Sequence, residues 1–214
     1  MYQEILGELN KLSETKFAEW LRPFLSIKDD SEEILLGVRV PKLRKLAKLY
    51  EDIDLITLKE LLNSNIHEAR LLAVFIMLLK SKKEPQLICG LYLQSLDRIN
   101  NWDLIDYSCP HIVAPYVDKK ILISLAETNY LWANRVAIVS TIYYIKKGYF
   151  DLTLELAEKF LSHPHHLIHK ATGWMLREIG KKDITILEEF LEKHSQNMPA
   201  VMKSYAKEIF KKAN

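Results

Sequence analysis

The sequence predicts an all-α protein built from stacked helical hairpins, and three observations lead to this prediction. Only six glycines and seven prolines occur among 214 residues, so few residues can interrupt helices. Apolar residues recur three and four positions apart over segments of roughly 10 to 15 residues, the spacing of one helix face. A similar segment also returns at intervals of 32 to 35 residues. A steady period of this length is typical of helical repeats stacked as a solenoid.

The individual helices are predicted from apolar spacing and from proline and glycine. The clearest helical segments are residues 58–63, 67–80, 85–96, 132–147 and 166–180. Pro41, Pro85 and Pro199 are expected to open helices, because a first turn does not need the N–H that proline lacks. Gly148 and Gly180 follow basic turns and are expected to end helices.

The repeat is carried by four segments, EARLLAVFIMLL, NWDLIDYSCPHI, ANRVAIVSTIYYI and IHKATGWMLREI. The third is β-branched enough to form a strand, but its length and its helical neighbours favour a helix. The positions set equivalent are Arg70, Trp102, Arg135 and Lys170, followed four residues later by Val74, Asp106, Val139 and Trp174. We expect these positions to line one concave face. For any single position, packing between helices is an equally good interpretation.

Composition predicts a single soluble domain over residues 1–214. The chain has no linker-like stretch, and its longest apolar run, residues 71–79, is far shorter than the ~20 residues of a membrane span. Two cysteines, Cys89 and Cys109, are too few for a disulfide framework and are expected to be buried thiols. The N-terminus lacks the charge order of a signal peptide. A cytoplasmic protein is therefore expected, nucleoid-associated when on DNA.

Asp106 is the first candidate for chemistry. It lies in the apolar sequence DLIDYSCP, where a core position would favour leucine and a solvated aspartate is the ordinary alternative. Pro110 offers no N–H to the carbonyl of Asp106, so a helix here should kink. Trp102 lies one turn before Asp106, and Trp174 occupies the comparable repeat position. Two indoles could flank one carboxylate, although a lone Trp usually belongs to the core.

Basic residues are segregated along the chain, although the net charge is only +2. Residues 38–48 contain five Lys or Arg and no acid, and acids concentrate in residues 29–33 and 155–158. The other basic positions are Lys170, Arg177, Lys181 and Lys182, then Lys203, Lys207, Lys211 and Lys212. A solvated basic helix face is the common explanation. Segregation at near-zero net charge also fits a phosphate-binding stripe, which we favour.

The histidines of HPHHLIH, at positions 163, 165, 166 and 169, are expected to cap a helix or face solvent. No cysteine or acid is placed to complete a metal site with them, so no metal is predicted. The sequence also lacks a phosphate-binding glycine loop, a nucleophile elbow, an HExxH motif and a deaminase signature. Any chemistry must therefore use few groups.

Four segments, GVRVPKLRKLAK, NNWDLIDYSCPHIV, LWANRVAIVSTIYYIKKG and LIHKATGWMLREIGKKD, resemble the AlkD-like DNA alkylation repair family over nearly the whole chain. The resemblance implies a HEAT-like α-solenoid with a concave basic groove that cradles alkylated double-stranded DNA. It implies removal of N3- or N7-alkylated purines as free bases, without a cofactor. No obligate protein partner is evident from the sequence.

Carried over by matching motifs, the catalytic aspartate is Asp106, the flanking tryptophans are Trp102 and Trp174, and the phosphate-contacting arginine is Arg135. The expected DNA-binding residues are Lys42, Arg44, Lys45, Arg135, Lys146, Lys147, Lys170 and Lys203. The chain departs from relatives at Asn101, where some have a second aromatic, and at Asn134, where another Arg is common. An aromatic from the N-terminal helices cannot be placed by motif.

A cationic alkylpurine can leave without a general acid, so one carboxylate could stabilise the oxocarbenium ion and orient water. No lysine stands out as a Schiff-base nucleophile, which predicts a monofunctional glycosylase. Two alternatives remain open. One is a non-catalytic binder of distorted or branched DNA on the same fold. The other is a HEAT-like protein scaffold, for which helical repeats alone would suffice.

Overall fold

The computed structural model describes residues 1–27 and 31–211 and divides into two compact units, Met1–Ser108 and Cys109–Asn214. Within the described residues every regular element is a helix, and a single parallel bridge joins Ile34 to Ile66. The prediction of an all-α protein is confirmed. The prediction of one domain over residues 1–214 stays a prediction.

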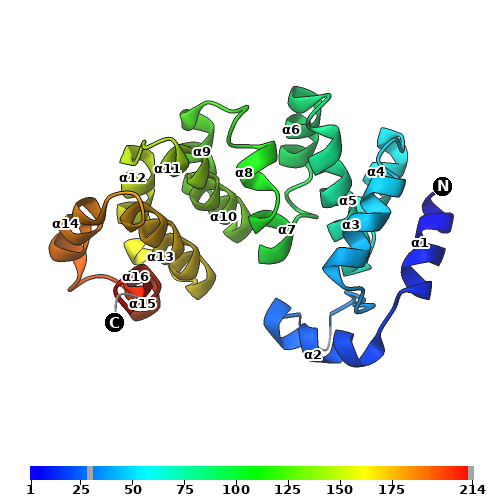
Figure 1. Ribbon diagram of the computed structural model, residues 1–214, viewed down its shortest axis with the longest axis horizontal. Helices are drawn as coiled ribbons and strands as arrows, with labels where there is room; N and C mark the ends of the chain where they lie inside the picture. The colour runs from blue at the N-terminus through cyan, green and yellow to red at the C-terminus, as the bar shows by residue number, and fades with distance from the viewer. Residues whose placement is uncertain (28–30, 212–214) are drawn as a thin grey trace. The chain divides into compact units, whose positions relative to one another are not determined.

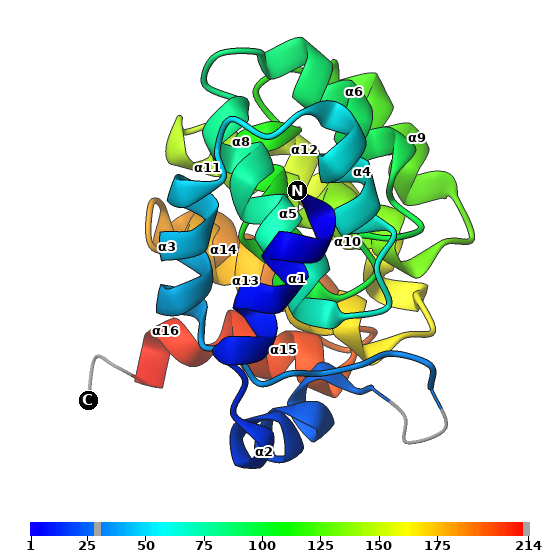
Figure 2. The same ribbon diagram turned by 90° about the vertical axis from the view of Figure 1, so that its right-hand side faces the viewer.

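Most helices of the first unit pack around one long helix, α5 (His67–Lys80; Figure 1). The helices of this unit are α1 (Tyr2–Lys11), α2 (Thr15–Leu25), α3 (Val40–Leu49), α4 (Leu55–Leu62), α5 (His67–Lys80), α6 (Pro85–Gln94) and α7 (Trp102–Asp106). Residues 67–77 of α5 are all buried, because α3, α4, α6 and α7 pack around it. Figure 2 shows α1 beside α4 and α5, where Ile5 and Leu9 are fully buried.

Helix α2 is held by the segment that follows it. The carbonyl of Leu36 accepts a hydrogen bond from the N–H of Glu14 at 3.0 Å. Gly37 adopts a positive φ of 77°, and a Cβ there would lie 2.3 Å from the Glu14 carbonyl oxygen. Only glycine combines this backbone conformation with so close an approach. The start of α2 is thereby fixed against residues 36–37.

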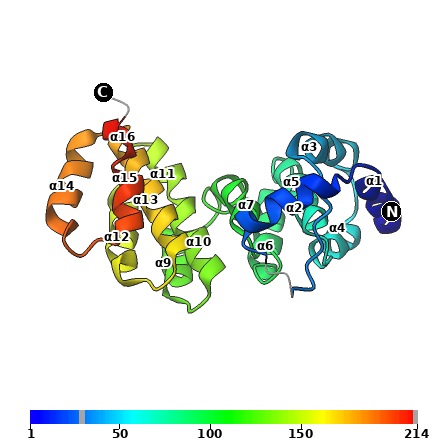
Figure 3. The ribbon, with the colours of Figure 1, turned by 90° about the horizontal axis from the view of Figure 1, so that it is seen from below.

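The second unit is organised around α13. Its helices are α8 (Cys109–Ile112), α9 (Lys119–Glu127), α10 (Leu131–Ser140), α11 (Ile142–Lys146), α12 (Asp151–Lys159), the 3₁₀ turn Phe160–Ser162, α13 (His166–Gly180), α14 (Ile184–His194), α15 (Ala200–Ala206) and α16 (Glu208–Lys211). Helix α13 lies between α10 and α15 (Figure 3). A Cβ at Gly173 would lie 2.4 Å from the Met202 carbonyl oxygen, so the two backbones touch here.

Most predicted helices are confirmed. Segments 67–80 and 166–180 are α5 and α13, and segments 58–63 and 85–96 match α4 and α6 within three residues at each end. Segment 132–147 is helical despite its β-branched composition, but it divides into α10 and α11 at Thr141. Apolar spacing alone does not reveal that break.

The helix boundaries predicted from proline and glycine are confirmed. Pro41 and Pro85 lie in first turns, and Pro199 is an N-cap. Gly148 follows α11 with a positive φ of 82°, as expected for a stop. Gly180 ends α13 as predicted, but it is the last residue of the helix and lacks a positive φ. Close packing excludes a side chain at Gly180, because a Cβ there would lie 2.4 Å from Cδ2 of Leu187.

Cys89 and Cys109 are buried free thiols, as predicted. The sequence predicted that a helix at Asp106 should kink because of Pro110. The helix is interrupted instead, with α7 ending at Asp106 and α8 beginning at Cys109. Among the helices of residues 1–27 and 31–211, none has the length and apolar character needed to cross a bilayer.

Candidate active site

Helix α7 is positioned by Asn101, which is almost fully buried. Its Oδ1 accepts a hydrogen bond from the N–H of Trp102 at 2.7 Å. Its Nδ2 donates to the carbonyl of Leu25 at 2.9 Å. The residue that departs from some relatives is therefore the N-cap of the helix that carries Asp106, and it also joins this helix to the end of α2.

Trp102, the first residue of α7, makes a second link to α2. Its indole Nε1 donates to the carbonyl of Phe24 at 3.1 Å. Its ring is half-buried and packs against a small apolar cluster of Ala18, Leu25, Ile27 and Leu35. One side of the indole thus serves packing, and the remainder stays accessible.

Asp106 lies at the last position of α7, one turn after Trp102, and is half-buried. The next residues hold this end of the helix. The hydroxyl of Ser108 donates to the carbonyl of Leu104 at 2.6 Å, which leaves the Tyr92 hydroxyl to donate to Ser108 at 2.7 Å. The carboxylate is therefore presented from a helix that is fixed at both ends.

An aromatic and cationic surface adjoins this end of α7. The Tyr107 ring meets the Phe75 ring edge-on, with centroids 5.8 Å apart. The guanidinium of Arg44 lies 5.2 Å from the centroid of each ring. The structure therefore brings Arg44, one of the predicted DNA-binding residues, close to the residue that follows Asp106.

Helix α2 presents a row of aromatic side chains that sequence reasoning did not identify. Phe17 and Trp20 stack with centroids 5.6 Å apart and an interplanar angle of 18°, and Trp20 lies 4.7 Å from Phe24. Trp20 and Phe24 are 58% and 57% exposed. Such large apolar side chains in solvent are typical of a contact surface. The signal was their i, i+3, i+7 spacing, which equally fits a buried helix face.

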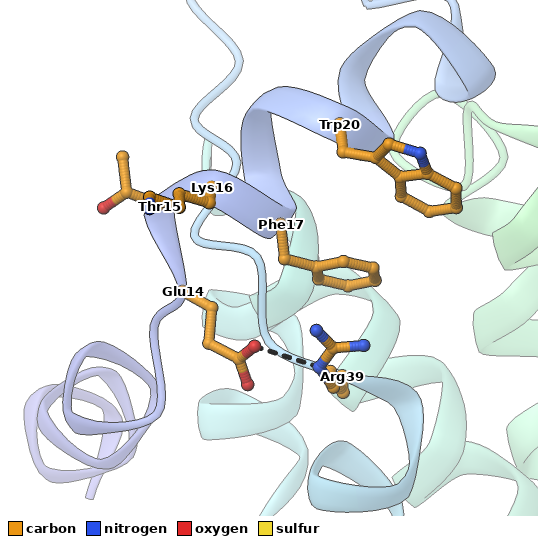
Figure 4. Close-up of a pocket in the computed structure, with 6 residues that line it drawn as sticks. All are labelled: Glu14, Thr15, Lys16, Phe17, Trp20 and Arg39. Atoms are coloured by element: carbon orange, nitrogen blue, oxygen red, sulfur yellow. Dashed lines mark hydrogen bonds and ion pairs between the residues drawn. The ribbon is translucent and has the colours of Figure 1, made fainter.

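An open pocket of about 660 Å³ lies beside this aromatic row (Figure 4). The guanidinium of Arg39 lies over the Phe17 ring, 4.2 Å from its centroid, and pairs with Glu14 at 2.9 Å. Lys42 pairs with the same carboxylate at 2.8 Å. Hydrogen bonds from Lys42 and Arg39 lower the pKa of Glu14. Lys42, predicted to bind phosphate, is thus engaged within the protein.

Trp174 lies half-buried on α13 in the second unit. Its indole Nε1 donates to Glu178 at 3.1 Å, one turn further along the helix. Glu178 also pairs with Lys181 at 2.6 Å, and Arg177 forms an ion pair with Glu208. Arg177 and Glu178 of α13 are therefore both engaged in ion pairs near this tryptophan, with each other at 3.7 Å and with charged residues that follow the helix.

Arg135 is only 5% exposed, and its Nη1 donates to the carbonyl of Leu167 at 2.7 Å. Its neighbour Asn134, the second departure from relatives, donates to the carbonyls of Leu125 and Thr128 and bonds to His163. Arg135 therefore holds α10 against the start of α13, and Asn134 holds it against the end of α9 and the segment before α13. The contact of Arg135 with phosphate stays a prediction, and its burial indicates a part in positioning.

The start of α13 is capped by His165, which is one of the two roles predicted for these histidines. Nδ1 of His165 accepts from the N–H of Leu167 at 3.1 Å, and Nδ1 of His163 accepts from the N–H of His165 at 3.0 Å. Burial is the largest cause that lowers the pKa of both histidines. A polar pocket of about 580 Å³ lies beside them, bounded also by Asn134 and Lys159.

The other predicted positions have different surroundings. Lys45, Lys146 and Lys147 are exposed, and Lys147 lies 4.0 Å from the ring centroid of Tyr143. Lys170 is half-buried, and Lys203 donates to the carbonyl of Ser195. The repeat-equivalent residues Arg70, Val74, Arg135 and Val139 are buried, so these four do not line an exposed face. Asp29 and Lys212 lie outside the described residues.

These features define an all-α helical-repeat protein with a tryptophan and a carboxylate on one short, firmly held helix. The chain belongs to the DNA alkylation repair enzyme family, whose model matches residues 5–210. No curated protein is similar enough to count as a match.

Two solved structures share the fold. One is described as a predicted DNA alkylation repair enzyme from Enterococcus faecalis, with a TM-score of 0.68 and 15% identity over 92% of this chain and 95% of that chain. The other is AlkD2 from Streptococcus mutans, with a TM-score of 0.55 and 17% identity over 90% of this chain and 95% of that chain. The suspected family and the helical-repeat fold are confirmed.

Proposed function

We propose that this protein is a monofunctional DNA glycosylase that removes cationic N3- or N7-alkylated purines from duplex DNA. The observation that carries the proposal is Asp106, a half-buried carboxylate presented one turn after Trp102 on the short helix α7. Family membership supports a role in DNA alkylation repair. Such a protein acts on DNA, so we expect a cytoplasmic, nucleoid-associated location.

Hydrolysis of the glycosidic bond of an alkylated purine requires few catalytic groups from the protein. An alkylated purine is already cationic and leaves as a neutral base, so no general acid is needed. As the glycosidic bond breaks, the sugar gains oxocarbenium character, which the carboxylate of Asp106 stabilises while it orients the attacking water. Two unit charges ~4 Å apart at an effective dielectric of about 20 attract by about 4 kcal/mol. Fully realised, this is about three decades of rate.

Aromatic and basic side chains supply binding. Trp102 contacts the deoxyribose and the cationic base through its accessible ring, a cation–π contact worth on the order of 1 kcal/mol. The row formed by Phe17, Trp20 and Phe24 offers the aromatic surface that the N-terminal helices were expected to provide. The resemblance gives Trp174 a comparable contact with the substrate. Exposed cations such as Arg44 and Lys45 bind phosphates, which makes affinity salt-dependent.

The decisive experiment measures release of 7-methylguanine and 3-methyladenine from methylated duplex DNA under single-turnover conditions. Asp106→Asn keeps the shape of the side chain and removes its charge. We expect the variant to lose at least a hundredfold in rate and to bind undamaged duplex DNA as tightly as the wild type. A wild type that binds DNA with a steep salt dependence but releases no base would be a non-catalytic DNA binder. A wild type that does not bind DNA would favour a protein scaffold.

A further inference from the structure

Four charged side chains form a cluster in the interior of the first unit. His67 is 1% exposed; its Nδ1 lies 2.7 Å from Glu33 Oε1 and its Nε2 lies 2.8 Å from Asp103 Oδ2. Arg70 donates to the same oxygen of Glu33. His67 and Arg70 belong to α5, Asp103 to α7, and Glu33 to the segment that leads from α2 to α3. The cluster therefore joins three parts of this unit.

Between two ionised carboxylates, this geometry requires a protonated imidazole. A neutral ring has one N–H and one lone pair, so one of its nitrogens would face a carboxylate oxygen lone pair to lone pair. A doubly protonated ring donates to both carboxylates. Two carboxylates, one guanidinium and one imidazolium also sum to zero charge, which a buried cluster needs.

The titration of these groups agrees with that geometry. Burial by itself lowers the pKa of His67, but the charge and hydrogen bond of Asp103, together with Glu33, outweigh it and raise the pKa to about 9. Burial likewise opposes the charge of Glu33, yet the hydrogen bond from His67 and the charge of Arg70 lower its pKa. Glu33, Arg70 and Asp103 are the charged groups that face His67 from the three parts packed around it.

Helix α7 depends on such contacts from outside. It has five residues, Trp102 to Asp106, and a helix this short does not hold its conformation without tertiary anchors. Asn101 and Trp102 anchor its start to α2, and Asp103 anchors it to α5. Among the described residues, the second oxygen of Asp103 is buried without a hydrogen-bond partner. The hydrogen bond from His67 is therefore the contact through which Asp103 joins α7 to α5.

The start of α5 also binds residues 36–38, the segment that contacts the start of α2. Glu68, next to His67, accepts hydrogen bonds from the N–H groups of Leu36, Gly37 and Val38, the shortest at 2.6 Å. Its carboxylate is bound to backbone, whereas His67 is bound to α7. His67 thus holds α7, and Glu68 holds the segment that contacts α2.

We propose that His67, as a buried imidazolium, is the positioning residue that sets α7, and hence Trp102 and Asp106, for base excision. The proposal rests on the glycosylase function proposed above. His67 does not touch the substrate; it acts through Asp103. Loss of its proton removes one of the two donors and leaves the cluster with a net negative charge, so the position of α7 is expected to depend on pH.

The sign of this dependence follows from the pKa values. A histidine whose pKa is raised on folding, from 6.5 to about 9, stabilises the fold fully below pH 6.5. That contribution declines as the pH rises and is lost above about pH 9. The effect is therefore expected on the alkaline side, opposite to the usual histidine switch.

The first test needs no activity. In protein labelled with ¹⁵N-histidine, the imidazole signals of the seven histidines are followed from pH 5 to 10, and His67 is assigned by its absence in His67→Gln. We expect one ring to remain doubly protonated to about pH 9. Titration of the His67 ring between pH 6 and 7 would overturn the proposal.

The second test separates positioning from stability. Single-turnover base release and affinity for undamaged duplex DNA are compared for His67→Gln, Asp103→Asn and a control, Asp54→Ala. Asp54 caps α4 through the N–H of Thr57 at 2.7 Å, so its loss weakens the same unit without touching α7. We expect at least a tenfold loss of rate at unchanged DNA affinity in the first two variants, and no such loss in the control.

The dependence of the rate on pH is also measured, because a residue that only stabilises the fold would leave it unchanged. The wild-type rate is expected to fall as the pH rises through 9, whereas the slower His67→Gln should lack this step. Asp103→Asn provides a milder variant if His67→Gln does not fold. Rates within twofold of wild type in both variants would overturn the proposal.

A third readout holds even if the protein releases no base. The indole N–H of Trp102 is hydrogen-bonded to Phe24, and its NMR signal reports the position of α7. We expect this signal to shift and its proton to exchange faster in His67→Gln and Asp103→Asn, but not in Asp54→Ala. An unchanged signal in both cluster variants would refute the positioning role. A wild type without base release would refute only the proposed glycosylase function.

Discussion

The indole N–H of Trp102 donates to the backbone carbonyl of Phe24, which lies 78 residues earlier in the chain. Phe24 belongs to the last turn of α2, where carbonyl groups have no partner within their own helix. The side chain of Asn101 satisfies the next carbonyl, that of Leu25. The start of α7 therefore caps the end of α2, and the aromatic row of α2 is tied to the helix that carries Asp106.

Trp102→Phe is expected to lower the free energy of unfolding of the first unit by about 1 kcal/mol, the usual net worth of one hydrogen bond. The aromatic ring that packs on the apolar cluster remains in this variant. Urea denaturation measures the change. Trp20→Phe is the matched control, because exposed Trp20 should change stability by less than about 0.5 kcal/mol. Equal stabilities of the two variants would contradict the importance of this bond.

Regular apolar spacing predicted the long helices well. Helices α5 and α13 begin and end where the sequence indicated, because each carries its spacing over four turns. The break at Thr141 was missed, since the apolar pattern continues across it. Gly180 ends α13 as predicted, but the sequence does not show whether a glycine at the end of a basic turn supplies a positive φ or, as here, makes room for a neighbour, Leu187.

The candidate site was predicted in part. The repeat register placed Trp102 one turn before Asp106 on one helix, and both lie on α7. It did not reveal that Arg70 and Arg135 are buried, because a buried and an exposed arginine look alike in a repeat. The cluster around His67 joins residues 34 and 36 positions apart, a separation that no local pattern reports.

Trp20→Ala is expected to weaken binding to alkylated duplex DNA about fivefold to tenfold. Aromatic contact with a base is worth roughly 1–3 kcal/mol, and part of that is retained by Phe17 and Phe24. Stability should hardly change, because Trp20 is largely exposed. Fluorescence anisotropy at fixed salt measures the affinity.

The control for this variant is Ile56→Ala, which removes a side chain that is 74% exposed on α4. It should bind DNA like the wild type. If Trp20→Ala binds as tightly as this control, the aromatic row is no part of the DNA contact. Its exposure would then need another explanation.

Gly37→Ala is expected to destabilise the first unit by roughly 2 kcal/mol or more. A Cβ at this position strains a positive φ of 77° and meets the Ala18 nitrogen at 2.7 Å. Gly90→Ala is the matched control within α6, where a Cβ would meet nothing within 4 Å. That substitution should stabilise by about 0.5–1 kcal/mol, because alanine favours a helix interior. Opposite signs in chemical denaturation are the expected result.

His165→Asn is expected to reduce the acid sensitivity of the second unit. His165 caps α13 through an unprotonated Nδ1, and burial, followed by nearby His166, His169 and Arg135, lowers its pKa. A histidine with a lowered pKa stabilises the fold above pH 6.5, and that contribution is lost as the pH falls through the folded pKa. Protonation would also remove the acceptor that caps the helix.

Asparagine is a strong N-cap that does not titrate in this range. The variant should therefore match the wild type within about 0.5 kcal/mol at pH 8 and lose less stability than the wild type between pH 7 and pH 5. Urea denaturation of both proteins across this range measures the difference. Because His163 also accepts a backbone hydrogen bond and has a lowered pKa, some acid sensitivity should remain. Parallel pH profiles for the two proteins would show that the cap of α13 does not depend on a neutral His165.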